Sequence, residues 1–152
     1  AGGSPPAFAA ALSGRRLSDR HFVGLVRRDH PLARGRLGLR AFAAAPQLVV
    51  RMTSGIQERI DAALAAKGLE RTDVLELPSY LAVPPLLHAA DFLAVLPGQL
   101  ADDFGRDGGF AVRELPLPLP ASTIRMPWHR RFHEDAGNVW LREVVARELA
   151  DR

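Results

Sequence analysis

The sequence contains no cysteine among its 152 residues. Disulfide bonds, thiolate nucleophiles and metal sites with thiolate ligands are therefore excluded. No apolar run approaches the roughly 18 consecutive residues that a membrane-spanning helix needs, so we expect no membrane insertion. The sequence also lacks a Walker-type phosphate loop, a GxGxxG fingerprint and a GxSxG elbow, which are common signatures of enzymes on α/β folds.

Lysine is almost absent, and arginine carries the positive charge. The chain has 20 Lys and Arg residues against 17 Asp and Glu, a net charge of +3, and Lys67 is its only lysine. The arginines are spread along the chain and form no basic stripe interleaved with aromatic residues. This pattern gives little reason to expect nucleic-acid binding by the segment itself.

The length and composition are those of about one soluble globular domain, with 47% hydrophobic and 24% charged residues. The chain begins AGGSPPAFAAALSGRR, which is small and Pro-rich with its charge last. A signal peptide places charge first and an apolar block second. We therefore expect a cytoplasmic protein, or a fragment whose native N-terminus has been removed.

The stretch from Gln47 to Gly68 organises the chain. It begins QLVVRM, which is typical of a buried strand, and continues TSGIQERIDAALAAKG, in which apolar residues recur at helical spacing. Thr53 and Ser54 are candidate caps for the helix N-terminus, and Ser54 with Gln57 three residues later fits a capping box. Gly68 stands where a helix end favours a left-handed residue. The stretch therefore predicts a strand, a polar turn and a helix.

A turn of this kind lies at the carboxyl end of its strand, where open α/β sheets bind ligands. The N-terminus of the following helix offers unpaired N–H groups and the positive end of the helix dipole to an anion. Thr53 and Ser54 are therefore either simple helix caps, which the spacing favours, or ligand contacts. One pair of hydroxyl groups can serve both purposes.

The rest of the chain predicts alternating strands and helices. We expect residues 1–16 to form a tail, with a short helix at Ala7–Leu12. Further strands are expected at His21–Arg27, Asp73–Leu77, Phe92–Leu96, Phe110–Leu115 and Thr123–His129. Further helices are expected at Tyr80–Ala90, Gln99–Phe104 and Asn138–Ala150. A short helical or turn segment is expected at Leu37–Ala45. The alternation implies βαβ units and a parallel or mixed sheet.

Two of these helices carry a more detailed expectation. Pro84 and Pro85 disrupt a helix interior, so the helix in that region is expected to start near Val83 or to be kinked. The last helix is amphipathic, and its buried side is expected to hold Val139, Leu141, Val144, Val145 and Leu149.

The histidines permit a metal-binding alternative. His129 and His133 are four residues apart, beside Glu134 and Asp135, and this spacing can place two ligands on one face of a helix. However, Pro127 indicates a strand end at this point, and the sequence has no HExxH pattern. We therefore expect no metal site.

A catalytic alternative would join Ser54, His88 and Asp91 as a triad. Ser54 is flanked by Thr53 and Gly55, not by the glycine-containing elbow that exposes a catalytic serine in α/β hydrolases. We therefore expect no catalytic residues, no enzymatic activity and no cofactor.

Four motifs in a fixed order are more specific than any single residue. RRDHPLA occupies residues 27–33, TSG residues 53–55, DFLAVLP residues 91–97, and WHRRFHEDAGNVWLRE residues 128–143. In this order they resemble the effector-binding region of LysR-type transcriptional regulators, particularly the branch that includes the nodulation regulators. The resemblance covers residues 17–150.

The resemblance implies an α/β fold with two lobes, like that of type 2 periplasmic binding proteins, in which two crossing strands join the lobes. His21–Arg27 would be the first crossing strand and Thr123–His129 the second. One lobe would be nearly whole, over residues 38–120. The other would be truncated and represented by residues 17–37 and 121–152. The family's N-terminal winged helix-turn-helix would be missing from the chain.

The resemblance also implies a bacterial, cytoplasmic regulator that senses a small molecule between its lobes, forms homo-oligomers and contacts DNA only through the missing domain. Its effector-binding residues would follow the strands of the nearly whole lobe, at Arg51, Met52, Thr53, Ser54, Ser79, Pro97 and Gly98. From the polar turn and the helix start we expect an effector with a carboxylate or another small anionic group.

Two alternatives to a regulator are open. A solute-binding protein of a transporter shares the fold, but it would need an export signal, and none is visible. An enzyme would need a nucleophile or a pair of carboxylates in a suitable arrangement, and the sequence offers neither.

Overall fold

The computed structural model of the chain describes residues 11–51, 55–72 and 74–150. The chain divides into two compact units, which are described separately here. The larger comprises residues 21–121, and the smaller comprises residues 1–20 and 122–152. Within the described parts, no helix is long and apolar enough to cross a membrane.

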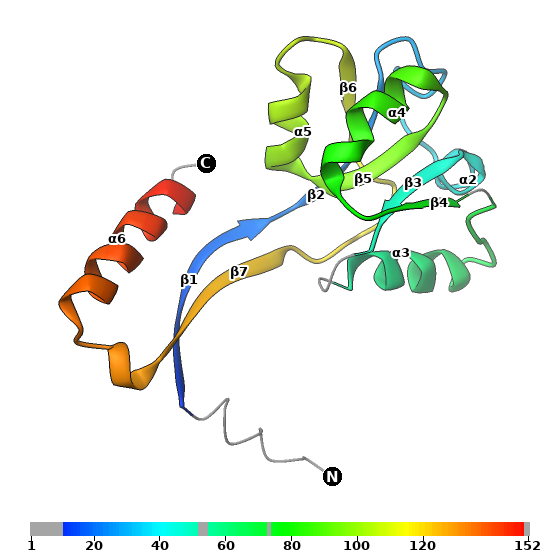
Figure 1. The fold of residues 1–152 in the computed structure, drawn as a ribbon. Helices are drawn as coiled ribbons and strands as arrows, with labels where there is room; N and C mark the ends of the chain where they lie inside the picture. Colours follow the sequence, from blue (N-terminus) through cyan, green and yellow to red (C-terminus); the bar gives the residue numbers. More distant parts are fainter. Residues whose placement is uncertain (1–10, 52–54, 73, 151–152) are drawn as a thin grey trace. The chain divides into compact units, whose positions relative to one another are not determined.

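The larger unit is built on a five-stranded sheet with the order β4-β3-β5-β2-β6 (Figure 1). Strand β3 runs parallel to β4 and β5, whereas β2 runs antiparallel to β5 and β6. The carboxyl ends of β3, β4 and β5 therefore meet at one edge of the sheet. The strands are β2 (Phe22–Arg27), β3 (Gln47–Val50), β4 (Val74–Leu77), β5 (Leu93–Pro97) and β6 (Phe110–Arg113).

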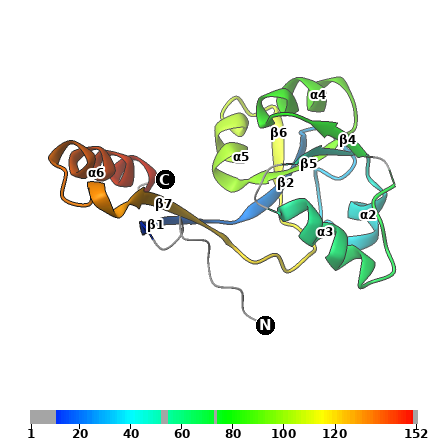
Figure 2. The same ribbon diagram turned by 60° about the horizontal axis from the view of Figure 1, so that its bottom comes forward.

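Helices cover both faces of this sheet (Figures 1 and 2). One face packs against α2 (Leu39–Ala44) and α3 (Ile56–Ala65), and the other packs against η1 (Tyr80–Ala82), α4 (Val83–Ala89) and α5 (Gly98–Gly105). Val26 belongs to the first core and its neighbour Leu25 to the second, because successive strand residues point to opposite faces. A sheet that is covered on both faces explains why its inner strands read as continuous apolar runs.

Two predictions about helix ends are confirmed. Helix α4 begins at Val83, so that Pro84 and Pro85 occupy its first turn, where a missing N–H breaks no helical hydrogen bond. After α3, Gly68 has a φ of 67°, and Leu69 N donates to Leu64 O at 3.0 Å. The left-handed glycine thus ends α3 as the sequence indicated.

The start of α3 differs from the capping box that the sequence predicted. Gly55, at a φ of 63°, occupies the N-cap position of α3 that the capping box assigned to Ser54. Ser54 lies outside the described residues. Gln57 is buried, and its side-chain oxygen accepts a hydrogen bond from Arg71 instead of facing a cap.

The smaller unit contains β1 (Leu12–Arg20), β7 (Ser122–His129), η2 (Arg130–Phe132) and α6 (Ala136–Ala150). Strands β1 and β7 pair antiparallel as a two-stranded ribbon. The predicted tail at residues 1–16 is therefore wrong from Leu12 onward, and Leu12 is in a strand and not in the predicted helix. Residues 1–10 lie outside the described part. The strand was missed because LSGRRLSDR is polar, and its register shifts between Arg16 and Ser18.

Strand β7 does not pair with the expected first crossing strand. Its partner is β1, whereas most of the predicted strand His21–Arg27 is β2 in the centre of the five-stranded sheet. Residues 21–37 therefore group with residues 38–120, and not with the C-terminal segment. The physical reason is burial: Gly24, Leu25 and Val26 are fully enclosed between two strands and two helical layers. The predicted crossing strands and lobe boundaries stay a prediction.

Helix α6 is less buried than its amphipathic pattern predicted. Ala146 is buried, but Val139 and Leu141 are 39% and 52% exposed. The predicted burial of Val139 and Leu141 is therefore wrong within this unit, where a two-stranded ribbon covers less of a helix than a full sheet does. Val144, Val145 and Leu149 are half-buried.

Candidate functional site

The predicted effector-binding residues that the structure describes come together at the carboxyl edge of the sheet. Arg51 follows β3, Ser79 follows β4, Pro97 ends β5, and Gly98 begins α5. Because β3, β4 and β5 are parallel neighbours, these positions share one edge. Met52, Thr53 and Ser54 lie outside the described residues, so their contacts stay a prediction.

Arg51 is already engaged by two carboxylates. Its Nε lies 2.6 Å from Oε1 of Glu76 on β4, and its Nη1 lies 3.6 Å from Oε1 of Glu58 in the first turn of α3. The hydrogen bond and the charge of Glu76 raise the pKa of Arg51. The guanidinium therefore ties β4 to α3, and an anionic effector would have to compete with these partners.

Ser79 caps the short helix η1. Its backbone is extended, and its Oγ accepts a hydrogen bond from Leu81 N at 3.2 Å. The residue is exposed, and its hydroxyl donates to no described residue. The oxygen thus has a structural role, while the hydroxyl hydrogen is free to meet a ligand at this edge.

His21 joins the same edge, although no pattern in the sequence pointed to it. Strand β2 runs antiparallel to β5, with Phe22 opposite Pro97, so the residue before β2 lies beside the end of β5. Gly98 N donates to His21 O at 3.0 Å. Gly98 is buried, whereas His21 is exposed. Only the long-range pairing of β2 with β5 brings them together, and no local sequence signal reports such a pairing.

A buried arginine in the loop before β4 was also missed. The Arg71 side chain is 3% exposed, and its Nη2 lies 2.5 Å from Oδ1 of Asp61. Its Nη1 donates to Oε1 of Gln57 at 2.8 Å and to Oε1 of Gln47 at 3.4 Å. Gln47 in turn donates to Phe42 O at 2.7 Å. One guanidinium therefore fixes the loop before β4 against both β3 and α3.

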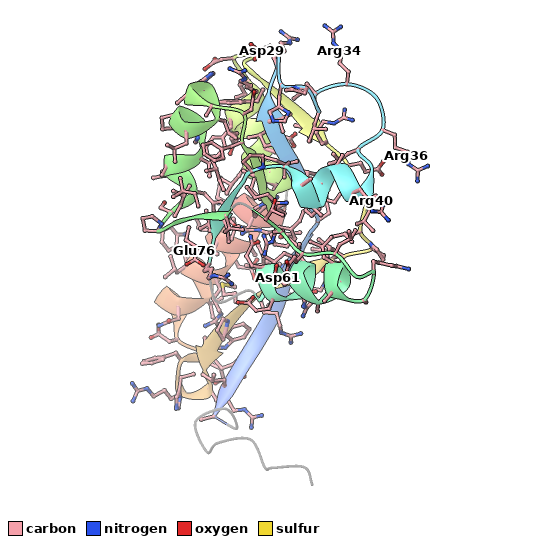
Figure 3. All side chains as sticks on the ribbon, turned by 90° about the vertical axis from the view of Figure 1, so that its right-hand side faces the viewer. Asp29, Arg34, Arg36, Arg40, Asp61 and Glu76 are labelled. Carbon is pink, nitrogen blue, oxygen red and sulfur yellow. The ribbon has the colours of Figure 1, made fainter. Side chains whose placement is uncertain are left out.

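A pocket of about 460 Å³ lies beside this arginine, with Arg51, Asp61, Arg71 and Glu76 among its lining residues. Figure 3 shows Asp61 on α3 and Glu76 on β4. Both arginines of the pocket are paired with acids of the same unit. The positive charges of this pocket are thus already paired.

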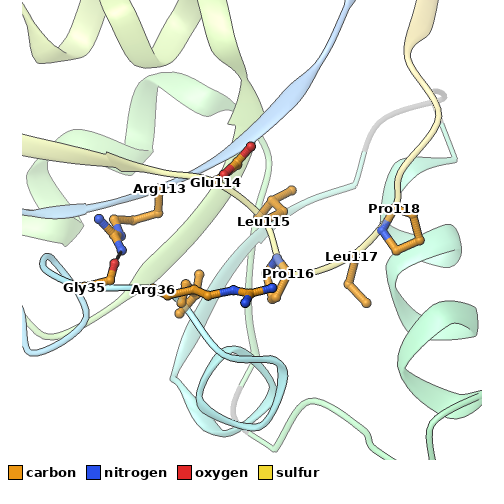
Figure 4. Close-up of a pocket in the computed structure, with 9 residues that line it drawn as sticks. Gly35, Arg36, Arg113, Glu114, Leu115, Pro116, Leu117 and Pro118 are labelled. Atoms are coloured by element: carbon orange, nitrogen blue, oxygen red, sulfur yellow. Dashed lines mark hydrogen bonds between the residues drawn. The ribbon is translucent and has the colours of Figure 1, made fainter.

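A larger pocket of about 700 Å³ lies along β6, between the loop at residues 35–37 and the segment at residues 113–118 (Figure 4). Arg113 spans one end of it, donating to Ala33 O at 3.1 Å and to Gly35 O. This pocket lies at the β6 side of the sheet, and β2 separates that strand from β5. Arg113 therefore links the loop at residues 33–35 to β6 through two hydrogen bonds. The predicted effector-binding residues do not line this pocket.

The described residues of the catalytic alternative make other contacts. Asp91 lies 2.7 Å from Arg27 Nη2, and the His88 ring packs on Phe110 with 4.6 Å between ring centres. His88 and Asp91 are therefore each engaged by another side chain. Ser54 lies outside the described residues.

The C-terminal motif forms the corner between β7 and α6. Trp128 Nε1 donates to His133 Nδ1 at 3.2 Å, and the two rings are stacked. The Arg142 guanidinium lies 4.6 Å from the Trp128 ring centre. Asp135 accepts from the backbone N–H and the side chain of Asn138, and these hydrogen bonds lower its pKa. These contacts hold β7 and α6 together, so this one of the four family-like motifs has a structural role.

Comparison with known proteins identifies relatives of the chain. It is 34% identical over 131 residues to the HTH-type transcriptional activator NahR of Pseudomonas putida, covering 86% of this chain and 44% of NahR. It is 31% identical over 140 residues to NagR of Ralstonia sp, covering 91% and 46% respectively. Nodulation protein D 2 of Sinorhizobium fredii is 32% identical over 85 residues, or 56% of the chain and 27% of that protein. The chain thus spans less than half the length of these relatives.

Solved structures share the fold. The regulatory domain of MexT from Pseudomonas aeruginosa matches with a TM-score of 0.77 and 23% identity over 90% of this chain and 67% of that domain. The effector-binding domain of QuiR, solved in complex with shikimate, matches with a TM-score of 0.68 and 15% identity over 98% and 70%. The BenM effector-binding domain, solved with its effector benzoate, matches with a TM-score of 0.63 and 15% identity over 99% and 68%.

These likenesses confirm the predicted α/β fold of the type 2 periplasmic-binding-protein kind, and they do not favour the transporter alternative. Residues 2–150 also match the family described as the LysR substrate binding domain. Because that match covers nearly the whole sequence, the chain belongs to the LysR substrate-binding domain family.

Proposed function

We propose that this chain is the effector-sensing part of a bacterial LysR-type transcriptional regulator that acts in the cytoplasm. Binding of a small molecule biases the conformation of the domain, and the bias changes how a separate DNA-binding domain engages DNA. Such control requires that the effector binds one conformation more tightly than the other. The role is that of a binding protein and not of an enzyme.

One observation carries the proposal. Arg51, Ser79 and Gly98 follow three parallel strands and meet at one edge of the sheet, and Thr53 and Ser54 follow Arg51 in the chain. This is the edge at which open α/β sheets bind their ligands. The family to which the chain belongs is described by substrate binding, which agrees with a ligand site there.

The effector is proposed to be a small carboxylic acid. Hydroxyl groups at a strand-to-helix turn and the N-terminus of α3 suit an anion, and hydrogen bonds to a charged group contribute about 1.5–3 kcal/mol each. Two structural relatives were solved with molecules of this kind, shikimate and benzoate. Small aromatic and alicyclic acids are therefore the first candidates.

Isothermal titration calorimetry with benzoate and shikimate tests the proposal. Thr53→Val and Ser54→Ala are each expected to weaken binding of the active acid by about tenfold or more, because each removes a hydroxyl contact. Thr72→Val is the matched control, since Thr72 is exposed and precedes β4 at the opposite edge of the sheet. If Thr53→Val and Ser54→Ala leave affinity unchanged and lower only stability, the hydroxyl groups are caps and the site lies elsewhere.

We further propose that the chain forms homo-oligomers. Val139, Trp140 and Leu141 on α6 are exposed, and so are Val74 and Leu75 on the edge strand β4. Adjacent exposed apolar residues of this kind favour protein–protein contact. Light scattering is expected to show association that rises with concentration and is weakened by Trp140→Ser but not by Leu81→Ser, a control at an isolated, 78% exposed leucine. A monodisperse monomer at high concentration would contradict this proposal.

A further inference from the structure

The imidazole of His21 lies directly on the backbone of Gly98. A Cβ atom added to Gly98 would lie 2.6 Å from Nε2, 3.1 Å from Cε1 and 3.2 Å from Cδ2 of His21. Real Cβ atoms do not approach other atoms to 2.6 Å, so any larger residue at position 98 displaces the ring. The ring therefore occupies the space that a side chain at position 98 would take.

Backbone conformation does not explain the glycine. The described glycines with positive φ are Gly35, Gly55, Gly68 and Gly108, and Gly98 is not among them. Gly98 begins the α5 helix with a backbone that alanine adopts equally well. The imidazole keeps its place on the backbone only while position 98 is a glycine.

Because the His21 ring covers Gly98, the atoms exposed to a ligand at the end of β5 are those of the imidazole. Gly98 is buried, and its N–H is bonded to His21 O. His21 is exposed, and neither of its ring nitrogens makes a hydrogen bond to another described residue. The sequence predicted that Pro97 and Gly98 contact the effector. Because the imidazole lies on Gly98, a ligand at the edge shared with Arg51 and Ser79 meets the donor and acceptor of the ring instead.

We propose that His21 contacts the effector directly, by donating a ring N–H to its carboxylate, and that Gly98 is a positioning residue that acts only through His21. This inference rests on the proposed function, because it adds a contact to the same edge of the sheet. It assigns a specificity role to a residue that precedes β2, outside the strand-to-helix turns of β3, β4 and β5.

A double-mutant cycle in the full chain tests this coupling, with the acid that calorimetry shows to bind as the probe. His21→Ala is expected to weaken binding about tenfold or more, since it removes a hydrogen bond to a charged group. His21→Gln, which keeps a neutral donor and acceptor, is expected to recover part of the loss. Gly98→Ala is expected to weaken binding in the parent chain but to have no further effect in the His21→Ala background.

Gly109→Ala is the matched control. A Cβ atom at Gly109 would lie 3.1 Å from Cε1 of His88, so the substitution disturbs a different imidazole, before β6 and away from the shared edge. Gly109→Ala is expected to leave affinity unchanged. Thermal unfolding of each variant verifies that the chain is folded, because His21 is an exposed side chain that can move aside in Gly98→Ala.

The outcomes separate the two proposals. If Thr53→Val weakens binding while His21→Ala and Gly98→Ala do not, the role of His21 is overturned and the proposed effector site stands. If Gly98→Ala weakens binding equally with and without His21, its action through the imidazole is overturned. If no acid binds, or if neither the turn variants nor His21→Ala weaken binding, the proposed site itself is wrong.

Discussion

Arg71 Nη2 lies 2.5 Å from Oδ1 of Asp61, although the Arg71 side chain is 3% exposed and Asp61 is 46% exposed. The same guanidinium donates to the buried side chain of Gln57. Arg71→Met would leave the Gln57 oxygen buried without that donor, which costs about 1–3 kcal/mol. We predict a loss of this size in the free energy of unfolding, measured by urea denaturation.

Two further variants make this prediction specific. Arg71→Lys is expected to be intermediate, because an ammonium group cannot reach the acceptors that a planar guanidinium bonds at once. Arg59→Met, on the exposed side of α3, is expected to change stability by less than about 0.5 kcal/mol. Equal losses for Arg59→Met and Arg71→Met would show that burial of the network is irrelevant.

The ion pair between Arg51 and Glu76 is expected to contribute little to stability. Both side chains are about half exposed, at 45% and 58%, and exposed pairs contribute about 0.2–1 kcal/mol. A double-mutant cycle with Arg51→Ala and Glu76→Ala should give a coupling energy in this range that falls as salt increases. The pair of Asp103 on α5 and Arg106 just after this helix, at the same 2.6 Å, serves as a comparison. A coupling well above 1 kcal/mol that is insensitive to salt would contradict this prediction.

The sequence predicted best where local chemistry is decisive. The strand at Gln47, the left-handed Gly68 and the start of α4 at Val83 all follow from apolar periodicity, glycine conformation or proline sterics within a few residues. The resemblance of four ordered motifs also predicted the family. Each local signal, and each of the four motifs taken singly, is contained in a short stretch of chain.

The sequence failed where structure depends on distant pairing. Strand β1 is polar, and its partner β7 is about a hundred residues away, as the pairing of Arg20 with Ser122 illustrates. His21 reaches Gly98 only through the antiparallel pairing of β2 with β5. The buried environment of Arg71 depends on Gln47, Gln57 and Asp61, which come from two other elements. No local periodicity reports contacts of this kind.

The pKa of Asp135 gives the corner between β7 and α6 a defined pH dependence. Hydrogen bonds from the side chain and backbone of Asn138 lower this pKa in the folded chain. Folding therefore favours the ionised carboxylate, and its stabilising effect is present at neutral pH and is lost as pH falls below the ordinary Asp value of about 3.9. We predict that α6 loses helical circular dichroism in that acidic range.

A substitution distinguishes the contribution of Asp135 to the acid transition from that of the other acidic residues. Asp135→Asn keeps a cap but cannot titrate, so the acid-induced loss should shrink. Asp19, whose pKa is lowered chiefly by a hydrogen bond from Thr123, has the same sign of pH dependence in the same unit. Asp19→Asn is therefore the comparison variant. An acid transition that is identical in the parent chain and in Asp135→Asn would exclude a contribution from this carboxylate.

Arg142 is expected to hold the indole of Trp128 in place. Its guanidinium lies over the ring, and its Nη atoms donate to Phe132 O at 3.0 Å and His133 O at 2.7 Å. Arg142→Ala removes both backbone hydrogen bonds and the cation–π contact, so water gains access to the indole. We predict a shift of Trp128 fluorescence to longer wavelength.

The measurement requires one preparatory change, because Trp140 is 67% exposed and would dominate the emission. In a Trp140→Phe background, Trp128 is the only remaining tryptophan. Arg142→Lys should shift the emission as well, because a single ammonium cannot stack on the ring while bonding both carbonyl groups. Arg147→Ala, an exposed arginine of the same helix, should leave the emission unchanged. An unshifted spectrum in Arg142→Ala would mean that the His133 stack alone positions the indole, since that contact persists in the variant.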